Sequence, residues 1–433
     1  MVNTTAKREE KVKASKSKIH AAWLVLIGLC IIVAFGKGVV NNSSGLFLTP
    51  VSKELGIGIG DLTLYMSISA VVTMVLLPVA GKLMAKYDIR LLLIIAVILQ
   101  GGSFAAFGLM NSVWGWYILA VPLAFGAIFL NVIAGPVLIN QWFRKNNGLA
   151  LGILTATGGL IGAFAQPVIG SLIVNQGWRY GYMAVGITAI IVVIPVTLLL
   201  IKKVSQNKGL YPYGMTDTEI ADQGSSNETQ NEGIAMSDAK KSSSFYALML
   251  FFFLITSVAS FMMHIPSYIV DKGFTQEFAG TAMGVYMLGV VLGAIIIGML
   301  NDKIGSRNTT IMTMGLGLIS ISLLLFAASS AVVIFVALVL FAFVTSGIGT
   351  LTPSLTQSLF GSKDYSQIYS TASLGLAIAA IVALPAYGYI FQFTGSYSGG
   401  LYTILVMLVL AIVAVLYAFK GKEKLLAAGA WKK

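Results

Sequence analysis

Long runs of apolar residues alternate with short polar segments along almost the whole chain. A run of about 20 apolar residues is long enough to cross the hydrocarbon core of a membrane as an α-helix. We therefore predict an all-α integral membrane protein with twelve transmembrane helices. They are expected at 22–42, 62–85, 90–110, 113–140, 147–174 and 179–201, and then at 245–270, 277–300, 308–328, 331–356, 366–392 and 398–420.

The first six apolar runs and the second six share residues at one fixed offset. A shift of 217 positions places Gly81, Lys86, Arg90, Pro136 and Phe143 opposite Gly298, Lys303, Arg307, Pro353 and Phe360. Internal repeats of this kind build transporters in which one bundle rocks against the other around a central site. The repeat therefore predicts two pseudo-symmetric six-helix bundles.

The segments outside the bundles are polar. We expect a basic cytoplasmic tail at 1–20, an N-terminal six-helix bundle at 21–201, a cytoplasmic linker at 202–244, a C-terminal six-helix bundle at 245–420 and a cytoplasmic tail at 421–433. The linker is rich in Ser, Asn, Gln, Asp and Lys, a composition that does not favour a folded domain. This argues against a sensor protein that carries a soluble output domain on a transporter scaffold.

Composition and charge agree with a membrane protein. The chain is 57% hydrophobic and only 10% charged, so its surface must face lipid. Its net charge of +12 is concentrated beside the apolar runs, which argues against nucleic acid as a partner. Lys and Arg gather on the side of the termini and the linker, so the positive-inside rule places both termini in the cytoplasm of a cell membrane. The single cysteine, Cys30, excludes an intrachain disulfide.

The loop at 298–307 reads Gly-Met-Leu-Asn-Asp-Lys-Ile-Gly-Ser-Arg. It resembles the loop motif of the major facilitator superfamily, and the resemblance implies the major facilitator fold. The first copy departs from the motif at Ala85, which stands opposite Asp302. The resemblance implies a gating role for Gly298, Asp302, Lys303, Gly305 and Arg307, and a weaker one for Gly81, Lys86 and Arg90.

A second resemblance narrows the family. Gln141-Trp-Phe-Arg-Lys-Asn-Asn-Gly-Leu-Ala-Leu-Gly152 leads into a glycine-rich helix, and Gly177-Trp-Arg-Tyr-Gly then opens the next one. This pattern resembles the oxalate:formate antiporter family and the related bacterial monocarboxylate transporters. Arg144 and Lys145 are expected to anchor the cytoplasmic end of the fifth helix, whose glycines permit close helix contact.

The departures from these families bear on the substrate. Oxalate carriers are expected to place an arginine in the eighth helix and a lysine in the eleventh, and this chain has neither. The Asp/Arg pair expected in the eighth helix of monocarboxylate transporters is also absent, but their first-helix lysine has a counterpart in Lys37. One cation matches a monoanion better than a dianion.

Lys37 lies within the first apolar run, between Gly36 and Gly38. A charge at membrane depth costs at least ~2.5 kcal/mol and usually marks a pathway. No Asp or Glu is expected near the middle of a span, so a substrate carboxylate would supply the missing countercharge. Asn41 and Asn42 would extend the polar face outward. The alternative is that Lys37 lies near the external end and extends its ammonium group to water.

His264 is the second titratable group predicted within the membrane, two residues before Pro266. Because the ordinary pKa of histidine is ~6.5, His264 could carry a co-transported proton, as could Lys37. The alternative is a structural, hydrogen-bonded histidine. Further candidate substrate contacts, each of which could instead join two helices by a hydrogen bond, are Tyr65, Asn131, Gln166, Tyr286 and Tyr369.

These observations predict a secondary active transporter for a small monocarboxylate such as lactate, pyruvate or formate, coupled to a proton. The alternatives are an oxalate:formate-type exchanger with a counter-anion, or a carrier of another small organic anion. An enzyme is not expected, because the chain has no paired buried carboxylates, nucleotide-binding loop or metal-ligand motif. We expect no cofactor or metal, membrane lipid as surroundings, and a monomer.

Overall fold

The computed structural model describes residues 20–143, 147–202, 213–214, 233–361 and 363–427. In this part of the chain the regular structure is helical, apart from isolated bridges at Phe143–Tyr213 and Gly233–Gly361. The predicted basic tail, most of the linker, and Arg144 and Lys145 lie outside the described residues.

The first half contains six membrane-crossing units, two of which are built from several helical segments. In chain order the segments are α2 (Ala21–Val33), η1 (Ala34–Asn41), α3 (Asn42–Leu55), α4 (Ile59–Lys86), α5 (Ile89–Phe107), α6 (Val113–Ala127), η2 (Ile128–Ile133), α7 (Ala134–Trp142), α8 (Asn147–Gln176) and α9 (Trp178–Leu200). The first unit runs without a break from α2 to α3, so it continues well beyond the predicted end at residue 42.

The second half follows a short helix, α10 (Met236–Ala239). Its segments are α11 (Ser243–Ser260), η4 (Phe261–His264), α12 (Ile265–Asp271), α13 (Gln276–Phe326), α14 (Ala331–Phe360), α15 (Tyr365–Ala372), α16 (Leu374–Thr394) and α17 (Ser398–Ala427). A turn of 3-10 helix precedes Pro266, which cannot donate a backbone hydrogen bond within the helix.

The described chain has 11 helices that are long and apolar enough to cross a membrane. One of them, α13, has 51 residues and breaks at Gly305, whose φ of 79° and ψ of 160° are not helical. Only glycine adopts this conformation without strain. The break separates two membrane helices, so the twelve-helix prediction and the all-α class are confirmed.

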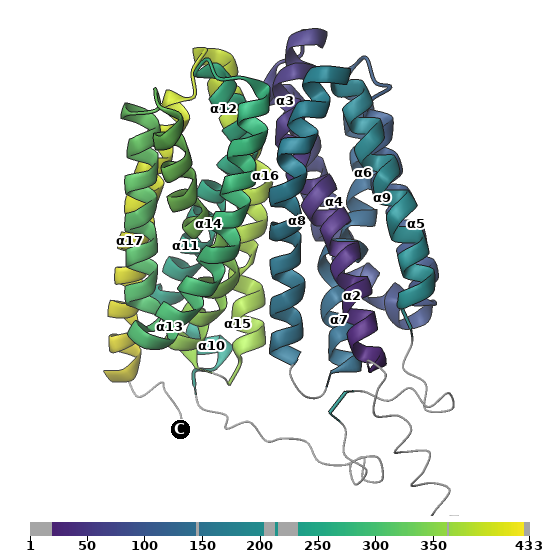
Figure 1. Cartoon of the computed structure of the whole chain (residues 1–433). Coiled ribbons are helices and arrows are strands. Elements are labelled where there is room, and N and C mark those ends of the chain that lie inside the picture. Colours follow the sequence, from purple (N-terminus) through teal and green to yellow (C-terminus); the bar gives the residue numbers. More distant parts are fainter. Residues whose placement is uncertain (1–19, 144–146, 203–212, 215–232, 362, 428–433) are drawn as a thin grey trace, which may run out of the picture.

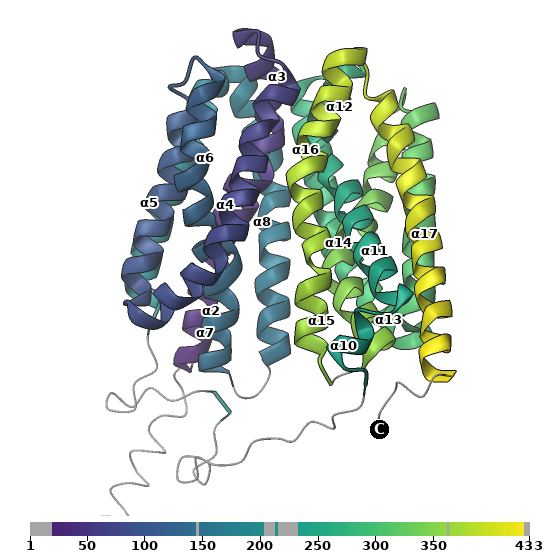
Figure 2. The same ribbon diagram turned by 180° about the vertical axis from the view of Figure 1, so that it is seen from behind.

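The two halves form two bundles that lie side by side (Figures 1 and 2). We call the end of the bundles that contains Leu200 and Ser243 the linker end, and the opposite end, which contains Leu55 and Asp271, the far end. Large apolar side chains are exposed around the outside, including Leu199 at 71% and Phe393 at 80%. Such a surface suits lipid rather than water.

The halves meet along two helix pairs, α8 with α13 and α4 with α16. Glycines make both crossings close: a Cβ at Gly170 would lie 3.2 Å from the Cα of Gly280, and a Cβ at Gly388 would lie 2.7 Å from the Cα of Gly60. Small residues permit this approach where no hydrophobic effect draws helices together.

Hydrogen bonds between the halves lie toward the far end. Among the described residues, Gln276 donates to the Leu46 carbonyl at 2.6 Å and Ser67 donates to the Ile381 carbonyl at 2.5 Å. These contacts join the two halves at the far end.

Candidate substrate site

The first membrane helix changes its winding where its only lysine at membrane depth occurs. Residues Ala34–Asn41 form a π-helix between the α-helical segments α2 and α3. Segments of π-helix are rare and occur frequently at functional sites. Lys37 lies in the middle of this segment, between the buried Gly36 and Gly38.

Lys37 lies against α8 of its own half. A Cβ at Gly158 of α8 would lie 3.8 Å from the Cδ of Lys37. Eight residues further along the first helix, a Cβ on Gly45 would lie 2.5 Å from the carbonyl oxygen of Met263 in the second half. Lys37 and Asn41 are exposed. Lys37 is therefore an exposed cation beside α8, a helix that contacts α13 of the second half.

Lys37 has no carboxylate partner in the described part of the chain. The one ion pair found there joins Arg179 to Glu54 at 3.3 Å, at the far end. Lys37 forms no hydrogen bond with another described residue, and no group of His, Cys, Asp and Glu in that part of the chain could hold a metal ion. Lys37 is thus a cation at membrane depth that forms no ion pair with another described residue.

Two amide side chains hold the helix on the other side of Lys37. Gln100 Nε2 donates to the carbonyl oxygen of Gly36 at 2.9 Å, and Asn131 Nδ2 donates to the same oxygen at 3.5 Å. Asn131 lies in η2, a second π-helical segment. Gln100 is 2% exposed, and the sequence analysis did not select it, because one glutamine in an apolar run carries no motif.

Asn42 and Gln166 lie where helices of the two halves cross. Asn42 Nδ2 donates to the sulfur of Met287 at 3.6 Å, across the interface. Gln166 is fully buried in α8, and within the described chain neither atom of its side-chain amide has a hydrogen-bond partner. A Cβ at Gly280 of α13 would lie 2.8 Å from the Gln166 carbonyl oxygen. The two side chains belong to the closed part of the interface, one turn or more beyond Lys37.

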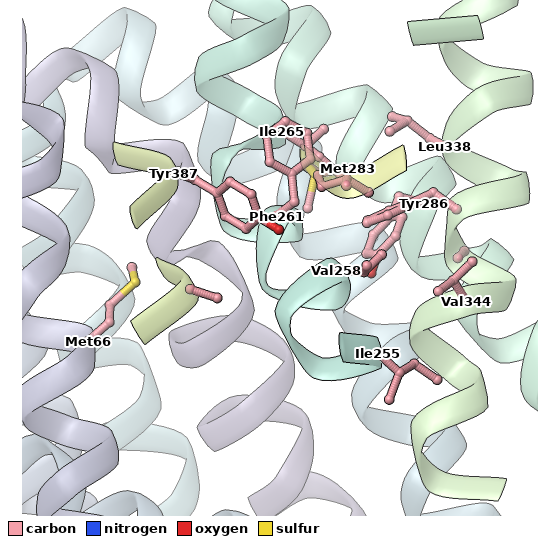
Figure 3. Close-up of a cluster of buried hydrophobic side chains, with 14 of the residues drawn as sticks. Met66, Ile255, Val258, Phe261, Ile265, Met283, Tyr286, Leu338, Val344 and Tyr387 are labelled. Carbon is pink, nitrogen blue, oxygen red and sulfur yellow. The ribbon is translucent and has the colours of Figure 1, made fainter. Parts of the chain in front are cut away.

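His264 lies inside the second bundle and has no exposed surface. Its Nε2 is 2.8 Å from the carbonyl oxygen of Leu384, and its Nδ1 is 3.4 Å from the hydroxyl of Tyr397. Its neighbours Phe261 and Ile265 belong to the buried apolar cluster of this bundle (Figure 3). In this conformation His264 has no surface to offer a substrate, and the geometry fits the structural alternative.

The predicted tyrosines also make their contacts within their own bundles. Tyr286 is fully buried, and its hydroxyl donates to Thr345 at 2.8 Å; Figure 3 shows its ring inside the second bundle. The Tyr369 hydroxyl is 3.3 Å from Thr352. Tyr65, 2% exposed, packs edge-on against Phe107 at 5.2 Å. The structure therefore places Asn131 at the Gly36 carbonyl, next to Lys37 in the chain, and does not bring His264, Tyr286 or Tyr369 to Lys37.

The residues of the repeated loop motif lie at the linker end. Asp302, Lys303, Gly305 and Arg307 are exposed around the break in α13, and a Cβ at Gly298 would meet nothing within 4 Å. In the first copy, Lys86 is exposed next to Tyr87, and Arg90 Nε donates to the Ile201 carbonyl at 2.6 Å. Gly81 lies in the last turns of α4. In the second copy the Arg307 guanidinium lies over the Phe419 ring, 5.8 Å from the ring centroid.

Comparison with known proteins agrees with this architecture. An uncharacterized MFS-type transporter of Escherichia coli, YhjX, is 23% identical over 83% of this chain and 86% of its own length. The oxalate:formate antiporter of Oxalobacter formigenes is 24% identical over 84% of this chain and 83% of its own. Monocarboxylate transporter 4 of Rattus norvegicus is 28% identical over 38% of this chain and 35% of its own.

Solved structures show the same fold at low identity. The nucleoside transporter NupG superimposes with a TM-score of 0.72 at 10% identity, covering 93% of this chain and all of NupG. A bacterial homologue of the lysosomal transporter Spinster, in an inward-facing conformation, gives a TM-score of 0.68 at 13% identity over 96% of this chain and all of its own. The sequence profile of the Major Facilitator Superfamily matches residues 28–280 and 271–432, so the chain is a multi-pass membrane protein that belongs to this transporter superfamily.

Proposed function

We propose that this protein is a secondary active transporter that moves a small monocarboxylate anion of the lactate, pyruvate or formate type across the cytoplasmic membrane. The observation that carries the proposal is Lys37, an exposed residue at membrane depth beside α8 that has no carboxylate partner in the described chain. A bound carboxylate would complete the ion pair and add charged hydrogen bonds.

The relatives support an organic anion as the substrate but do not identify which anion it is. One is named an oxalate:formate antiporter and others are named monocarboxylate transporters, all at low identity. The single cation favours a monoanion, because a second carboxylate would stay uncompensated. An oxalate:formate-type exchanger is the second candidate, and the match over most of both chains is what favours it.

In the mechanism we propose, the substrate enters from the linker end and binds Lys37 with help from Asn41. We take the linker end as cytoplasmic, with both termini on that side, because lysines and arginines gather there. The halves then rock: the far-end contacts break and the linker ends close, so that Lys37 faces the other side. In this proposal Asp302, Lys303 and Arg307 hold the linker end when it is closed.

We propose a proton as the coupling ion, with a counter-anion as the alternative, and a monomer as the working unit. Of the two predicted proton carriers, Lys37 has the exposed position that proton exchange requires, whereas His264 has no exposed surface in this state. We therefore assign coupling to Lys37 together with its carboxylate substrate, and a structural role to His264.

The experiment that tests this function is uptake into proteoliposomes of labelled lactate, pyruvate, formate, oxalate and succinate, with and without an inward proton gradient. We expect uptake of at least one monocarboxylate, faster with the gradient, and little uptake of the dicarboxylates. Oxalate uptake that requires formate inside the vesicles would favour the exchanger. Absence of uptake for all five anions would contradict the proposal.

A further inference from the structure

The carbonyl oxygen of Gly36 accepts hydrogen bonds from two other helices at once. Gln100 reaches it from α5 and Asn131 reaches it from η2, at 2.9 and 3.5 Å. A carbonyl oxygen has two lone pairs, so these two donors use its full capacity. Three helices are therefore joined at the residue that immediately precedes Lys37.

The joint has no room for a side chain at position 36. A Cβ on Gly36 would lie 2.6 Å from Asn131 Oδ1 and 3.3 Å from Gln100 Oε1. In the described chain neither of these oxygens has a hydrogen-bond partner, although both are buried. Leaving buried acceptors unpaired is costly, so apolar packing alone does not account for two amides at this point.

The joint also coincides with the change in helical winding. The π-helix spans Ala34–Asn41, and within it Asn42 N bonds to the Lys37 carbonyl instead of the carbonyl four residues back. Asn131 itself lies in the π-helix Ile128–Ile133. A π-helical turn has more residues than an α-helical turn, so its presence rotates every side chain within it relative to the helix that follows. The winding at Gly36 therefore sets the direction of Lys37.

We infer that Gln100 and Asn131 are positioning residues for Lys37: by holding the Gly36 carbonyl they keep the first helix in its π-helical form, with Lys37 in its exposed position. Without them we expect the segment to rewind toward an α-helix, which would rotate Lys37 away from its exposed position. The inference rests on the proposed function of Lys37 for its consequence in transport, but the conformational statement stands by itself.

The first test reads the direction of residue 37 without any substrate. Lys37→Cys is made in a Cys30→Ser background, which leaves a single thiol, and its reaction with a water-soluble maleimide is timed in detergent. Adding Gln100→Met or Asn131→Leu is expected to slow labelling at least about fivefold, as expected for loss of hydrogen bonds of roughly 1 kcal/mol each. The matched control is Ser69→Ala, which removes another hydrogen bond between helices, a partly buried one from α4 to the Ala120 carbonyl at 3.3 Å.

Labelling within twofold of the parent in both variants would overturn the inference. A shorter amide, Gln100→Asn, serves if Gln100→Met does not fold, and thermal unfolding in detergent identifies folded variants. Since no anion is present, this outcome is independent of whether the substrate is a monocarboxylate.

The second test reads the consequence for binding. With Lys37 present, Gln100→Met is expected to weaken lactate binding about five- to twentyfold. In a Lys37→Gln background the same change is expected to have no further effect, because Gln100 acts through Lys37. If Gln100→Met lowered lactate affinity by the same factor in both backgrounds, Gln100 would have only a general structural role. If Lys37→Gln binds lactate as the parent does, the proposed function fails while the labelling result still decides the positioning.

Discussion

The hydroxyl of Tyr389 donates a hydrogen bond of 3.0 Å to a carboxylate oxygen of Asp61, and the two residues belong to opposite halves of the protein. Gln392 donates to the other carboxylate oxygen at 3.3 Å, and the Tyr117 hydroxyl donates to the Asp61 carbonyl at 2.7 Å. Asp61 lies in the first turn of α4, where the helix dipole favours a negative charge. The far end is thus held by a carboxylate of one half and two donors of the other.

This relationship predicts the effect of weakening the far-end contact. Asp61→Asn and Tyr389→Phe are each expected to favour the conformation that opens at the far end, because a charged hydrogen bond contributes about 1.5–3 kcal/mol. Spin labels at Lys53→Cys and Lys272→Cys, one on each half, would measure the distance between the two halves at the far end. Both are made in a Cys30→Ser background. Asp88→Asn, at the linker end, is the control. An unchanged distance distribution in both variants would show that the contact does not hold the far end closed.

Asp302 provides a prediction for the opposite end. It is exposed beside the Gly305 break, and in the described chain it forms no ion pair. If it pairs only when that end closes, Asp302→Asn is expected to slow turnover severalfold and leave substrate affinity nearly unchanged. Initial uptake rates and equilibrium binding separate the two quantities, and Glu423→Gln is a matched exposed acid. Lost affinity with normal turnover would exclude a gating role.

Gly38 is predicted to be needed for the contact between the first and fifth helices. A Cβ there would lie 2.7 Å from the backbone oxygen of Gly158, which cannot move without displacing α8. Gly38→Ala should lower stability by about 1–3 kcal/mol, the usual cost of overpacking. Thermal unfolding in detergent would show this as a lower midpoint. Gly102→Ala is the control, because its Cβ would meet nothing within 4 Å. Equal midpoints for the two variants would mean that α8 shifts to make room for the added methyl group at little cost in stability.

His264 is predicted to be structural. Its two ring nitrogens contact Leu384 and Tyr397, so His264→Gln should lower stability by about 1–3 kcal/mol through an unsatisfied buried group. The folded fraction should still accelerate uptake in response to an inward proton gradient. Proteoliposome uptake with and without the gradient measures this. Loss of the gradient response with intact counterflow exchange would return proton coupling to His264.

Much of the fold could be predicted from the sequence, for physical reasons. Apolar runs of membrane length fix the helices, and the spacing that pairs Gly81 with Gly298 fixes the two halves. Gly305, within the repeated motif, marks the break in α13. The first helix was predicted too short because α3 beyond Asn42 is moderately polar and extends past the apolar run.

The site was only partly predictable. Lys37 stands out because a cation in an apolar run is costly. The two π-helical segments have no sequence signature, so the joint between Gly36, Gln100 and Asn131 could not be foreseen. His264 and Tyr286 were selected as polar groups in apolar helices, but sequence alone does not show which side of a helix faces the bundle interior and which faces the space between bundles.

The central claim is that Lys37 binds the substrate carboxylate, and the affinity of the purified Lys37→Gln protein for lactate, or for whichever monocarboxylate is transported best, tests it most directly. Glutamine keeps a donor but removes the charge, so affinity should fall by about 1.5–3 kcal/mol, roughly 10- to 150-fold. Lys37→Arg should also be impaired, because a planar guanidinium cannot replace a compact ammonium without moving the ligand. Unchanged affinity in Lys37→Gln would contradict the claim.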